Sequence, residues 1–455
     1  MKSARFFSIW ACVSAVGLAA CLSALAGEPL ADAVAKVRPS ESTERCGGEN
    51  CAAVARGLMG FLDRRLSGLK GNGRACADCH MPNDNLQLSP AGAQARFELL
   101  QWRRKWNPRA QDPLFLPIDA DDFHVNGDNA SDFSNLLENG LVRVTLPLPA
   151  NMRLVDPATN AVSNETTAEV WRMVPSVNNV KLTGADGANP LWPRGPNVSG
   201  GYQLDGRQAD LQAQALGALI NHAQISKTPE PSFLDDLAAF QNVLFSTPRV
   251  RALADAVRAG KTPLPDTDLP LSVLATQGKQ VFIRSCAQCH GGPGQSTTQL
   301  PLPLRFHDIS SQCPRPVDTV VPARWSFEPC PARLARNART YEITQANGTV
   351  VRRTSSDPGR ALLTGFVGGP APADDWNKFD VNGLHGISKT APYFHNNSAD
   401  TLEQVVDHYI AFYKRAQAIA PPGVVPPFAT TDGVHFDRQP LPEERAALLA
   451  YLKTL

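Results

Sequence analysis

Two short patterns in the chain, each of the form Cys-x-x-Cys-His, carry the residue types that attach a haem. The first runs from Cys76 to His80 and the second from Cys286 to His290. The two thiols can form thioether bonds to one haem, and the adjacent histidine can then bind its iron. A zinc site would need two further Cys or His residues at close spacing, and neither pattern has them. We therefore expect two covalently bound haem c groups, whose attachment and iron-binding residues are Cys76, Cys79, His80, Cys286, Cys289 and His290.

The start of the chain is typical of an export signal. Lys2 and Arg5 precede an apolar run that ends in Ala24-Leu25-Ala26, which predicts a signal peptide over residues 1–26 and a periplasmic location. The residues up to Cys21 also resemble a lipobox, so a lipid anchor at Cys21 is one alternative and an incidental cysteine is the other. No later apolar run approaches the roughly 20 residues that span a bilayer.

The composition argues against nucleic acid as a partner and suits an oxidising compartment. The formal net charge of +1 over 455 residues argues against a nucleic-acid binder, which would carry a basic surplus. Four cysteines remain outside the signal and the haem patterns, and an even number suits an oxidising compartment. Pairing between nearest neighbours predicts Cys46–Cys51 and Cys313–Cys330, although sequence does not fix the connectivity.

The elements that must position the haem patterns are predicted to be mainly α-helical. We expect two cytochrome c-like haem domains, over residues 27–260 and 271–455, joined by a proline-rich polar linker at 261–270. Apolar spacing predicts helices over 233–245 and 274–283.

Two further segments complete the predicted fold. A closing helix is expected over 442–455, with Pro442 in its first turn. Residues from about 97 to 170 are rich in Pro, Asp and Asn, which predicts an insertion of loops and a short hairpin, with a strand at 141–146.

With these features in place, the chain resembles the bacterial di-haem cytochrome c peroxidase superfamily, which includes the MauG enzymes. The similar segments follow the family order and are Phe61–Gly68, Val174–Val180, Leu204–Arg207, Leu211–Ala215, Asp357–Arg360, Thr390–His395 and Thr401–Tyr409. The resemblance implies that the haem on His80 is peroxidatic and that the haem on His290 transfers or stores electrons. It also implies a calcium ion at Asn179, Thr390 and Pro392, for which ordinary turn packing is the alternative.

The second haem lacks the methionine ligand of conventional peroxidases within its own domain. The last of the chain's five methionines is Met173. Tyr409 stands where MauG-type enzymes carry a ligating tyrosine, and a phenolate favours ferric and higher oxidation states of iron. We therefore predict a low-potential His/Tyr second haem. The alternative is a core tyrosine, with His395 or His408 as the ligand.

Around the first haem the chain departs from the family. Gln214 matches the usual distal glutamine, whereas Gln224 aligns with the usual catalytic glutamate and Ala218 with a usual proline. Cleavage of peroxide needs a group that takes up a proton and returns it. An amide cannot titrate, so His222 is the candidate for that role, with a helix-surface histidine as the alternative.

Two further roles have more than one candidate: the electron relay between the haems and the sixth ligand of the first haem. The family's tryptophan between the haems aligns with Leu204, which leaves Tyr202 or Trp192 as candidate relays. His124, in the insertion, could be a sixth ligand of the first haem, and an ordinary loop histidine is the alternative.

The resemblance implies an oxidoreductase of peroxidase type that uses hydrogen peroxide. In the MauG-like reading, high-valent haem would oxidise a protein or an organic donor. A small periplasmic electron-transfer protein, a cytochrome c or a cupredoxin, is the other partner expected. Three alternatives stay open: a conventional cytochrome c peroxidase that reduces peroxide to water, a di-haem dioxygenase of the rubber-cleaving type, and a non-catalytic electron-transfer cytochrome.

Overall fold

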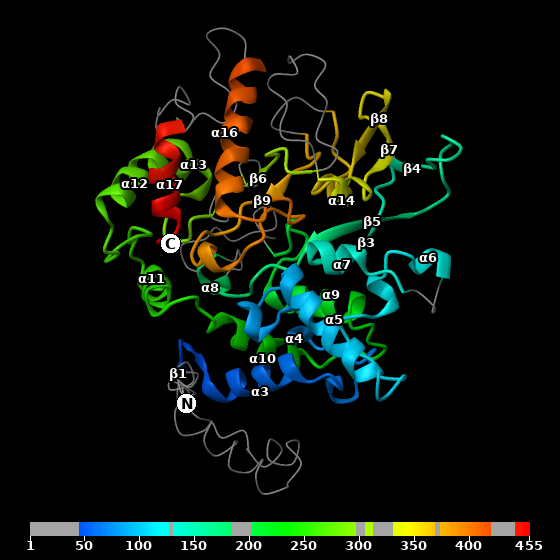
Figure 1. Cartoon of the computed structure of the whole chain (residues 1–455). Coiled ribbons are helices and arrows are strands. Elements are labelled where there is room, and N and C mark those ends of the chain that lie inside the picture. The colour runs from blue at the N-terminus through cyan, green and yellow to red at the C-terminus, as the bar shows by residue number, and fades with distance from the viewer. Residues whose placement is uncertain are drawn as a thin grey trace, which may run out of the picture.

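The computed structural model is helix-rich, with four small sheets, and the strands labelled β3, β4, β5, β7 and β8 lie on the right in Figure 1. It describes residues 45–126, 131–183, 202–296, 305–312, 331–368, 374–419 and 442–455. The helices are α3 (Cys51–Leu62), α4 (Cys76–Cys79), α5 (Pro90–Arg104), α6 (Phe123–Asn126), α7 (Ser134–Asn139), α8 (Val180–Thr183), α9 (Leu211–Asn221), α10 (Pro231–Asn242), α11 (Pro248–Arg258), α12 (Val273–Ser285), α13 (Ala287–His290), α14 (Ala332–Ala335), α15 (Ala361–Thr364), α16 (Leu402–Ile419) and α17 (Arg445–Leu452). The predicted mainly helical character is confirmed.

The helix before each haem pattern packs tightly against a later helix. In the first half α3 crosses α10, and a Cβ at Gly57 would lie 1.9 Å from the Asp236 carbonyl oxygen. In the second half α12 crosses α17, and a Cβ at Gly278 would lie 1.8 Å from the Ala447 carbonyl oxygen. Only glycine allows such an approach of two backbones. The two halves therefore repeat one arrangement around their haem patterns.

The predicted helices lie close to their expected bounds. The helix expected over 233–245 is α10, and the one expected over 274–283 is α12. The closing helix is confirmed as α17, with Leu448, Leu449 and Leu452 buried. Its first turn differs, because Pro442–Glu444 forms a 3₁₀ turn before the α-helix begins. The described helices include none that is long and apolar enough to cross a membrane.

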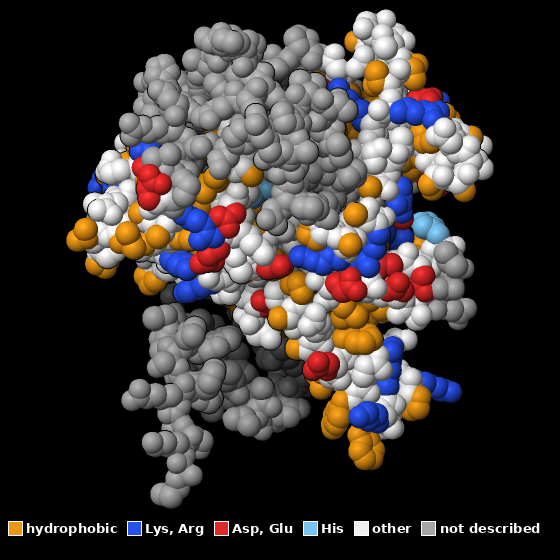
Figure 2. All heavy atoms as spheres, turned by 45° about the horizontal axis from the view of Figure 1, so that its top comes forward, with side chains coloured by type: hydrophobic (Ala, Val, Ile, Leu, Met, Phe, Trp, Pro, Cys, Tyr) orange, Lys and Arg blue, Asp and Glu red, His pale blue; other side chains and the backbone are white. Residues whose placement is uncertain are grey.

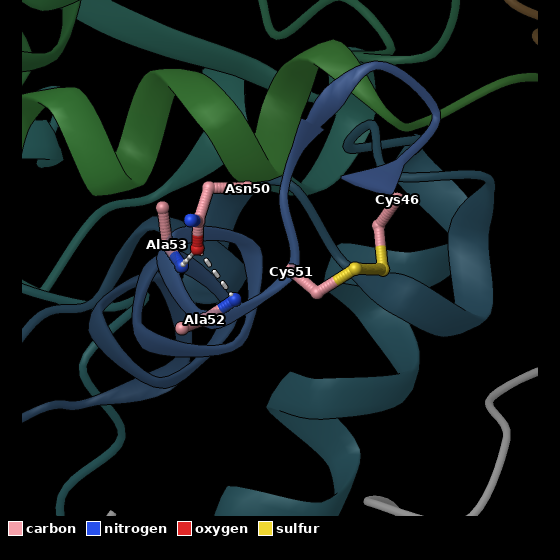
Figure 3. Close-up of a disulfide and its surroundings, with 5 residues drawn as sticks. All are labelled: Cys46, Asn50, Cys51, Ala52 and Ala53. Carbon is pink, nitrogen blue, oxygen red and sulfur yellow. Dashed lines mark hydrogen bonds between the residues drawn. A yellow bond between two sulfur atoms is a disulfide. The ribbon is translucent and has the colours of Figure 1, made fainter. Parts of the chain in front are cut away.

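The N-terminal hairpin carries a disulfide. Strands β1 (Arg45–Cys46) and β2 (Glu49–Asn50) pair in antiparallel fashion, and Cys46 is bonded to Cys51 (Figure 3). Asn50 then caps α3, because its side-chain oxygen accepts hydrogen bonds from the N–H groups of Ala52 and Ala53. The predicted Cys46–Cys51 pair is confirmed, whereas Cys313, Cys330, Trp192 and the signal segment lie outside the described residues.

The insertion is more ordered than the predicted loops and short hairpin. Strands β3 (Leu141–Pro147) and β5 (Thr167–Met173) form a seven-residue antiparallel ladder. Between them, β4 (Met152–Val155) pairs instead with β7 (Arg339–Thr344) of the second half, and β7 pairs with β8 (Val350–Ser355).

The three-stranded sheet joins the two halves for a physical reason. A strand needs partners for its backbone groups, and β4 finds them on β7. Met152 and Leu154 then pack with Tyr341 and Ile343 in one buried cluster. This long-range pairing could not be predicted from local patterns. A last pair of short strands, β6 (Phe306–His307) and β9 (Phe379–Asp380), lies beside the cavity described next.

Candidate functional site

Both haem patterns open into one cavity of about 690 Å³. The cysteines and the histidine of each pattern line it, together with residues from both halves of the chain. Its wall is more apolar than polar, as is usual for a site that holds a large organic cofactor. The structure thus brings together two sequence patterns that lie far apart in the chain.

The first pattern presents its thiols and its imidazole ring to this cavity. Cys76 and Cys79 are free thiols one helical turn apart on α4. The Nδ1 atom of His80 lies 3.1 Å from the Leu86 carbonyl oxygen and 3.0 Å from that of Pro175. Because Nδ1 is bonded to the backbone, the ring is oriented and Nε2 is left for a metal. This is the usual arrangement of a histidine that ligates iron.

The charge within the first pattern is neutralised by arginines. Asp78 is buried between the two cysteines and accepts hydrogen bonds from Arg64 and from Arg96 of α5. Its carboxylate also accepts from the N–H group of Ala75, at the start of α4. These contacts hold α4 in place beside the cavity.

The second pattern is built in the same way. Cys286 lies between α12 and α13 as the residue that caps both, Cys289 and His290 lie on α13, and both thiols are free. The Nδ1 atom of His290 lies 3.0 Å from the Gln295 carbonyl oxygen, so its Nε2 is also left for a metal. Burial lowers the pKa of His290 to about 4, which keeps the imidazole neutral and able to ligate. Both patterns therefore fit a covalently attached haem.

Tyr409 lies beside the second pattern. It comes from α16 and lines the cavity, with its ring 6.4 Å from that of Tyr413. Burial, and then the nearby Cys289 and Cys286 thiols, raise the pKa of its phenol. The proton must therefore be displaced by a cation if Tyr409 is to bind as phenolate.

The alternative ligands of the second haem differ in position. The Nε2 atom of His408 lies 2.7 Å from the Ile309 carbonyl oxygen, and His408 does not line the cavity. His395 does line it: its ring stacks on Phe379 with centroids 3.9 Å apart, and its Nδ1 lies 3.1 Å from the Ser311 hydroxyl oxygen. Its buried Nε2 has no hydrogen-bond partner, so His395 stays an alternative and His408 does not.

Met173 is a cavity residue that sequence reasoning set aside. It ends β5 in the first half of the chain, and its N–H donates to the His395 carbonyl oxygen at 2.8 Å. Met173 is one of the residues that line the shared cavity, and its side chain packs against Leu141, Trp171 and Leu334, which do not line it. A methionine from the first half therefore lies at the edge of the site.

One face of α9 lines the cavity near the first pattern. Gln214 and Ala218 are four residues apart, and His222 follows after another four, so all three share that face. Burial lowers the pKa of His222 to about 4 and keeps it neutral at ordinary pH. Gln224 lies elsewhere: its side chain is exposed, its Oε1 accepts from Asn72 at 3.0 Å, and it does not line the cavity.

Arg74 is a charged cavity residue that sequence reasoning missed. Its side chain is buried and donates to Asp119 at 2.6 Å and to the carbonyl oxygens of Pro113 and Leu114. All three partners belong to the insertion, so no local pattern could have revealed them. The pair places a compensated guanidinium at the wall of the cavity, within the electrostatic reach of His222.

Two of the three other predicted positions near the haems line the cavity. Tyr202 and Leu204 both line the cavity. His124 does not: it lies on the short helix α6, and its exposed side chain pairs with Glu169 at 2.8 Å, so both the sixth ligand and the loop histidine are corrected to a surface histidine of a helix.

The predicted calcium residues also line the cavity. The Asn179 side chain accepts from the Ser246 N–H at 2.8 Å and donates to the His385 carbonyl oxygen at 3.0 Å, which ties the two halves together. Thr390 and Pro392 lie on the wall as well. All three residues are uncharged, and within the described residues no group of three or more His, Cys, Asp or Glu side chains gathers as a metal site.

Comparisons with known proteins give structural matches only. No protein-family model matches the chain, and no curated protein sequence matches it. Among solved structures, a MauG-like protein associated with microbial copper homeostasis is 17% identical, with a TM-score of 0.43 over 92% of this chain and 91% of that one. The diheme peroxidase BthA from Burkholderia thailandensis is 16% identical, with a TM-score of 0.41 over 90% and 86%. Hydrazine synthase from Kuenenia stuttgartiensis is 15% identical, with a TM-score of 0.30 over 82% and 94%.

TM-scores below 0.5 do not by themselves establish a shared fold. The functional assignment therefore depends on the cavity and on the residues that line it.

Proposed function

We propose that the chain is an exported di-haem c-type oxidoreductase of peroxidase type, similar to the MauG and cytochrome c peroxidase enzymes. The observation that carries the proposal is the single cavity into which both Cys-x-x-Cys-His patterns open, each with its histidine Nδ1 bonded to backbone carbonyls. Covalent attachment would use Cys76 and Cys79 for one haem and Cys286 and Cys289 for the other. When bound, the haem pair would supply the redox chemistry, which is the reduction of hydrogen peroxide with two electrons from a donor.

The cavity wall on α9 would handle protons for this reaction. Neutral His222 can take a proton from one peroxide oxygen and return it to the departing oxygen. Gln214, on the same face two turns earlier, can donate a hydrogen bond from its amide to hold the peroxide. The proposal leaves Gln224 out, because its amide is engaged by Asn72 away from the cavity.

The second haem would take Tyr409 as its sixth ligand. Tyr409 is the phenol that lies beside Cys286 and Cys289, and a phenolate would hold a haem that tolerates oxidation. This assignment favours oxidation of a protein or organic donor over the transfer of electrons from a high-potential centre.

Met173 supports a second candidate, a conventional cytochrome c peroxidase. Met173 is among the residues that line the same cavity, and a thioether would raise the potential of a haem that it ligated. Absorption and spin-resonance spectra of the ferric protein separate the two candidates, because replacing the true ligand changes the coordination of one haem. The same spectra also distinguish an enzyme from an electron carrier. One high-spin and one low-spin haem fit an enzyme, whereas two low-spin haems would favour an electron carrier.

The proposal also includes the predicted environment of the enzyme. We place it in the periplasm, with a small electron-transfer protein or a protein substrate as its partner. Calcium would be bound through oxygen atoms of Asn179, Thr390 and Pro392, at a wall that both halves of the chain share. Atomic analysis of the protein purified without chelator tests the ion, and metal-free protein would remove it from the proposal.

A further inference from the structure

An exposed aromatic surface stands at the C-terminal end of α5. The exposed fractions are 79% for Trp106, 57% for Trp102 and 53% for Leu99. In Figure 2, orange and blue side chains gather together on the lobe at the lower right, in the region where α5 ends in Figure 1. Large apolar side chains that cluster in the open mark a binding surface more often than isolated ones do. We call Leu99, Trp102, Arg103, Lys105, Trp106 and Arg109 the Trp–Arg surface.

The charge of the Trp–Arg surface is positive. Arg103, Lys105 and Arg109 are exposed, and no ion pair joins them to a described residue. Elsewhere many arginines do form ion pairs, for example Arg56 with Asp236 and Arg445 with Asp407. Cations without such partners, interleaved with two indoles, are complementary to carboxylates on another molecule.

The Trp–Arg surface contains a shallow, open hollow. It is lined by Trp102, Arg103, Trp106, Asn107 and Ala110. The turn that follows α5 is fixed by a hydrogen bond from the Ala110 N–H to the Asn107 carbonyl oxygen at 2.8 Å, and Arg104 Nε donates to the Ala110 carbonyl oxygen at 3.1 Å. The backbone of this turn therefore loses little freedom when a partner binds.

The same helix is bound to the first haem pattern. Arg96 of α5 donates to the Asp78 carbonyl oxygen at 2.8 Å and to the Asp78 carboxylate at 2.9 Å, between Cys76 and Cys79. Phe97, the next residue, packs in the core cluster that Cys79 also contacts. A molecule that binds the Trp–Arg surface therefore sits on the helix that supports the first haem pattern.

We propose that the Trp–Arg surface docks an acidic electron-donor protein with an apolar patch that packs on the indoles. Tryptophan and arginine are among the side chains that dominate protein–protein binding energy, and the shallow hollow that both indoles line can receive an apolar side chain of the partner. The inference rests on the proposed function, since two docking events would return two electrons. With two protons, these electrons reduce one hydrogen peroxide to two waters, and each donor molecule is oxidised by one electron.

The test uses the holoenzyme, with reduced plastocyanin as an acidic probe and the dye ABTS as a small donor that needs no docking surface. We expect saturable oxidation of plastocyanin, with a KM that increases with salt because exposed charges are screened. Trp102→Ala with Trp106→Ala should raise that KM about tenfold, as should Arg103→Glu with Lys105→Glu. The matched control Lys227→Glu with Lys261→Glu makes the same change in net charge at exposed sites elsewhere and should leave KM within about twofold.

The outcomes separate the docking surface from the proposed function. ABTS turnover should be the same in all four proteins, and its absence in the wild type would instead contradict the proposed function. With ABTS turnover intact, failure of the wild type to saturate with plastocyanin, or equal KM values in the surface and control variants, would overturn the docking proposal. Loss of binding to phosphatidylglycerol vesicles in the tryptophan variant, with no change in the plastocyanin KM, would overturn it in favour of a lipid surface.

Discussion

Arg172 and Asp357 form a buried two-point ion pair that joins the two halves of the chain. Arg172 Nε donates to one carboxylate oxygen at 2.6 Å and Nη2 donates to the other at 3.0 Å. The third nitrogen of the same guanidinium donates to Asp205 at 2.6 Å. All three side chains are nearly inaccessible to solvent, and Arg172 lines the cavity between the haem patterns. The relative position of the two halves is therefore fixed by charge at the site itself.

Removing this guanidinium should be costly. Arg172→Met leaves the buried Asp357 carboxylate without its ion-pair partner, whereas Asp205 keeps Arg207 at 2.7 Å, so we expect the free energy of unfolding to fall by about 3–5 kcal/mol. Chemical denaturation of the holoenzyme measures it. The control Arg56→Met breaks an ion pair with Asp236 in which the arginine is half exposed, and should cost about 1 kcal/mol or less. Equal effects of the two substitutions would show that the buried pair does not hold the halves together.

Tyr409→Phe should change the coordination of one haem. The substitution removes only the phenol oxygen beside Cys286 and Cys289, so we expect the second haem to lose its sixth ligand and become high-spin in the ferric spectrum. Tyr413→Phe is the matched control, because the Tyr413 hydroxyl already donates to the Ser285 carbonyl oxygen. If Met173→Leu produces the change and Tyr409→Phe does not, the ligand is the thioether.

His222→Ala should slow the reaction with peroxide. Loss of the only titratable side chain on the cavity face of α9 should lower kcat/KM for hydrogen peroxide by about 10²–10⁴-fold. Gln224→Ala should leave kcat/KM almost unchanged, since its side chain lies outside the cavity. Rapid mixing with peroxide measures both. Similar losses in the two variants would return Gln224 to the mechanism.

The value of kcat/KM for hydrogen peroxide should fall only at low pH. His222 can accept a proton only when it is neutral, and burial lowers its pKa to about 4. The rate should therefore hold as the pH falls below 6.5 and decline only as it approaches 4. A decline centred near 6.5 would mean that His222 is solvated, which contradicts its place in the cavity wall.

Buried histidines should make the fold sensitive to acid. Burial lowers the pKa of His395 from 6.5 to about 4, so between these values the unfolded chain binds a proton that the folded chain does not. Stability from this group is fully present above pH 6.5 and falls as the pH decreases, by up to about 1.4 kcal/mol per pH unit. His395→Gln should flatten the dependence of the free energy of unfolding on pH over that interval. An unchanged slope would show that His395 is protonated in the folded state.

The residues that bind haem or take part in the proposed chemistry could be predicted from the sequence, whereas the buried arginines that line the cavity could not. The haem patterns, Gln214, His222 and Tyr409 could be located because each depends on local spacing or on a family motif, and all of them line the cavity. Arg74 and Arg172 could not, because their partners Asp119 and Asp357 lie 45 and 185 residues away in the chain. The pairing of β4 with β7 has the same origin, since strand partners at long range leave no local pattern.

The central claim is that the chain carries two haem groups, one on each Cys-x-x-Cys-His pattern. The most direct measurement is the intact mass of the purified protein together with a pyridine haemochrome assay, in the wild type and in two double variants. We expect two covalent haems per wild-type polypeptide, and one in Cys76→Ala with Cys79→Ala and in Cys286→Ala with Cys289→Ala. A colourless wild-type protein at the mass of the bare polypeptide would contradict the account.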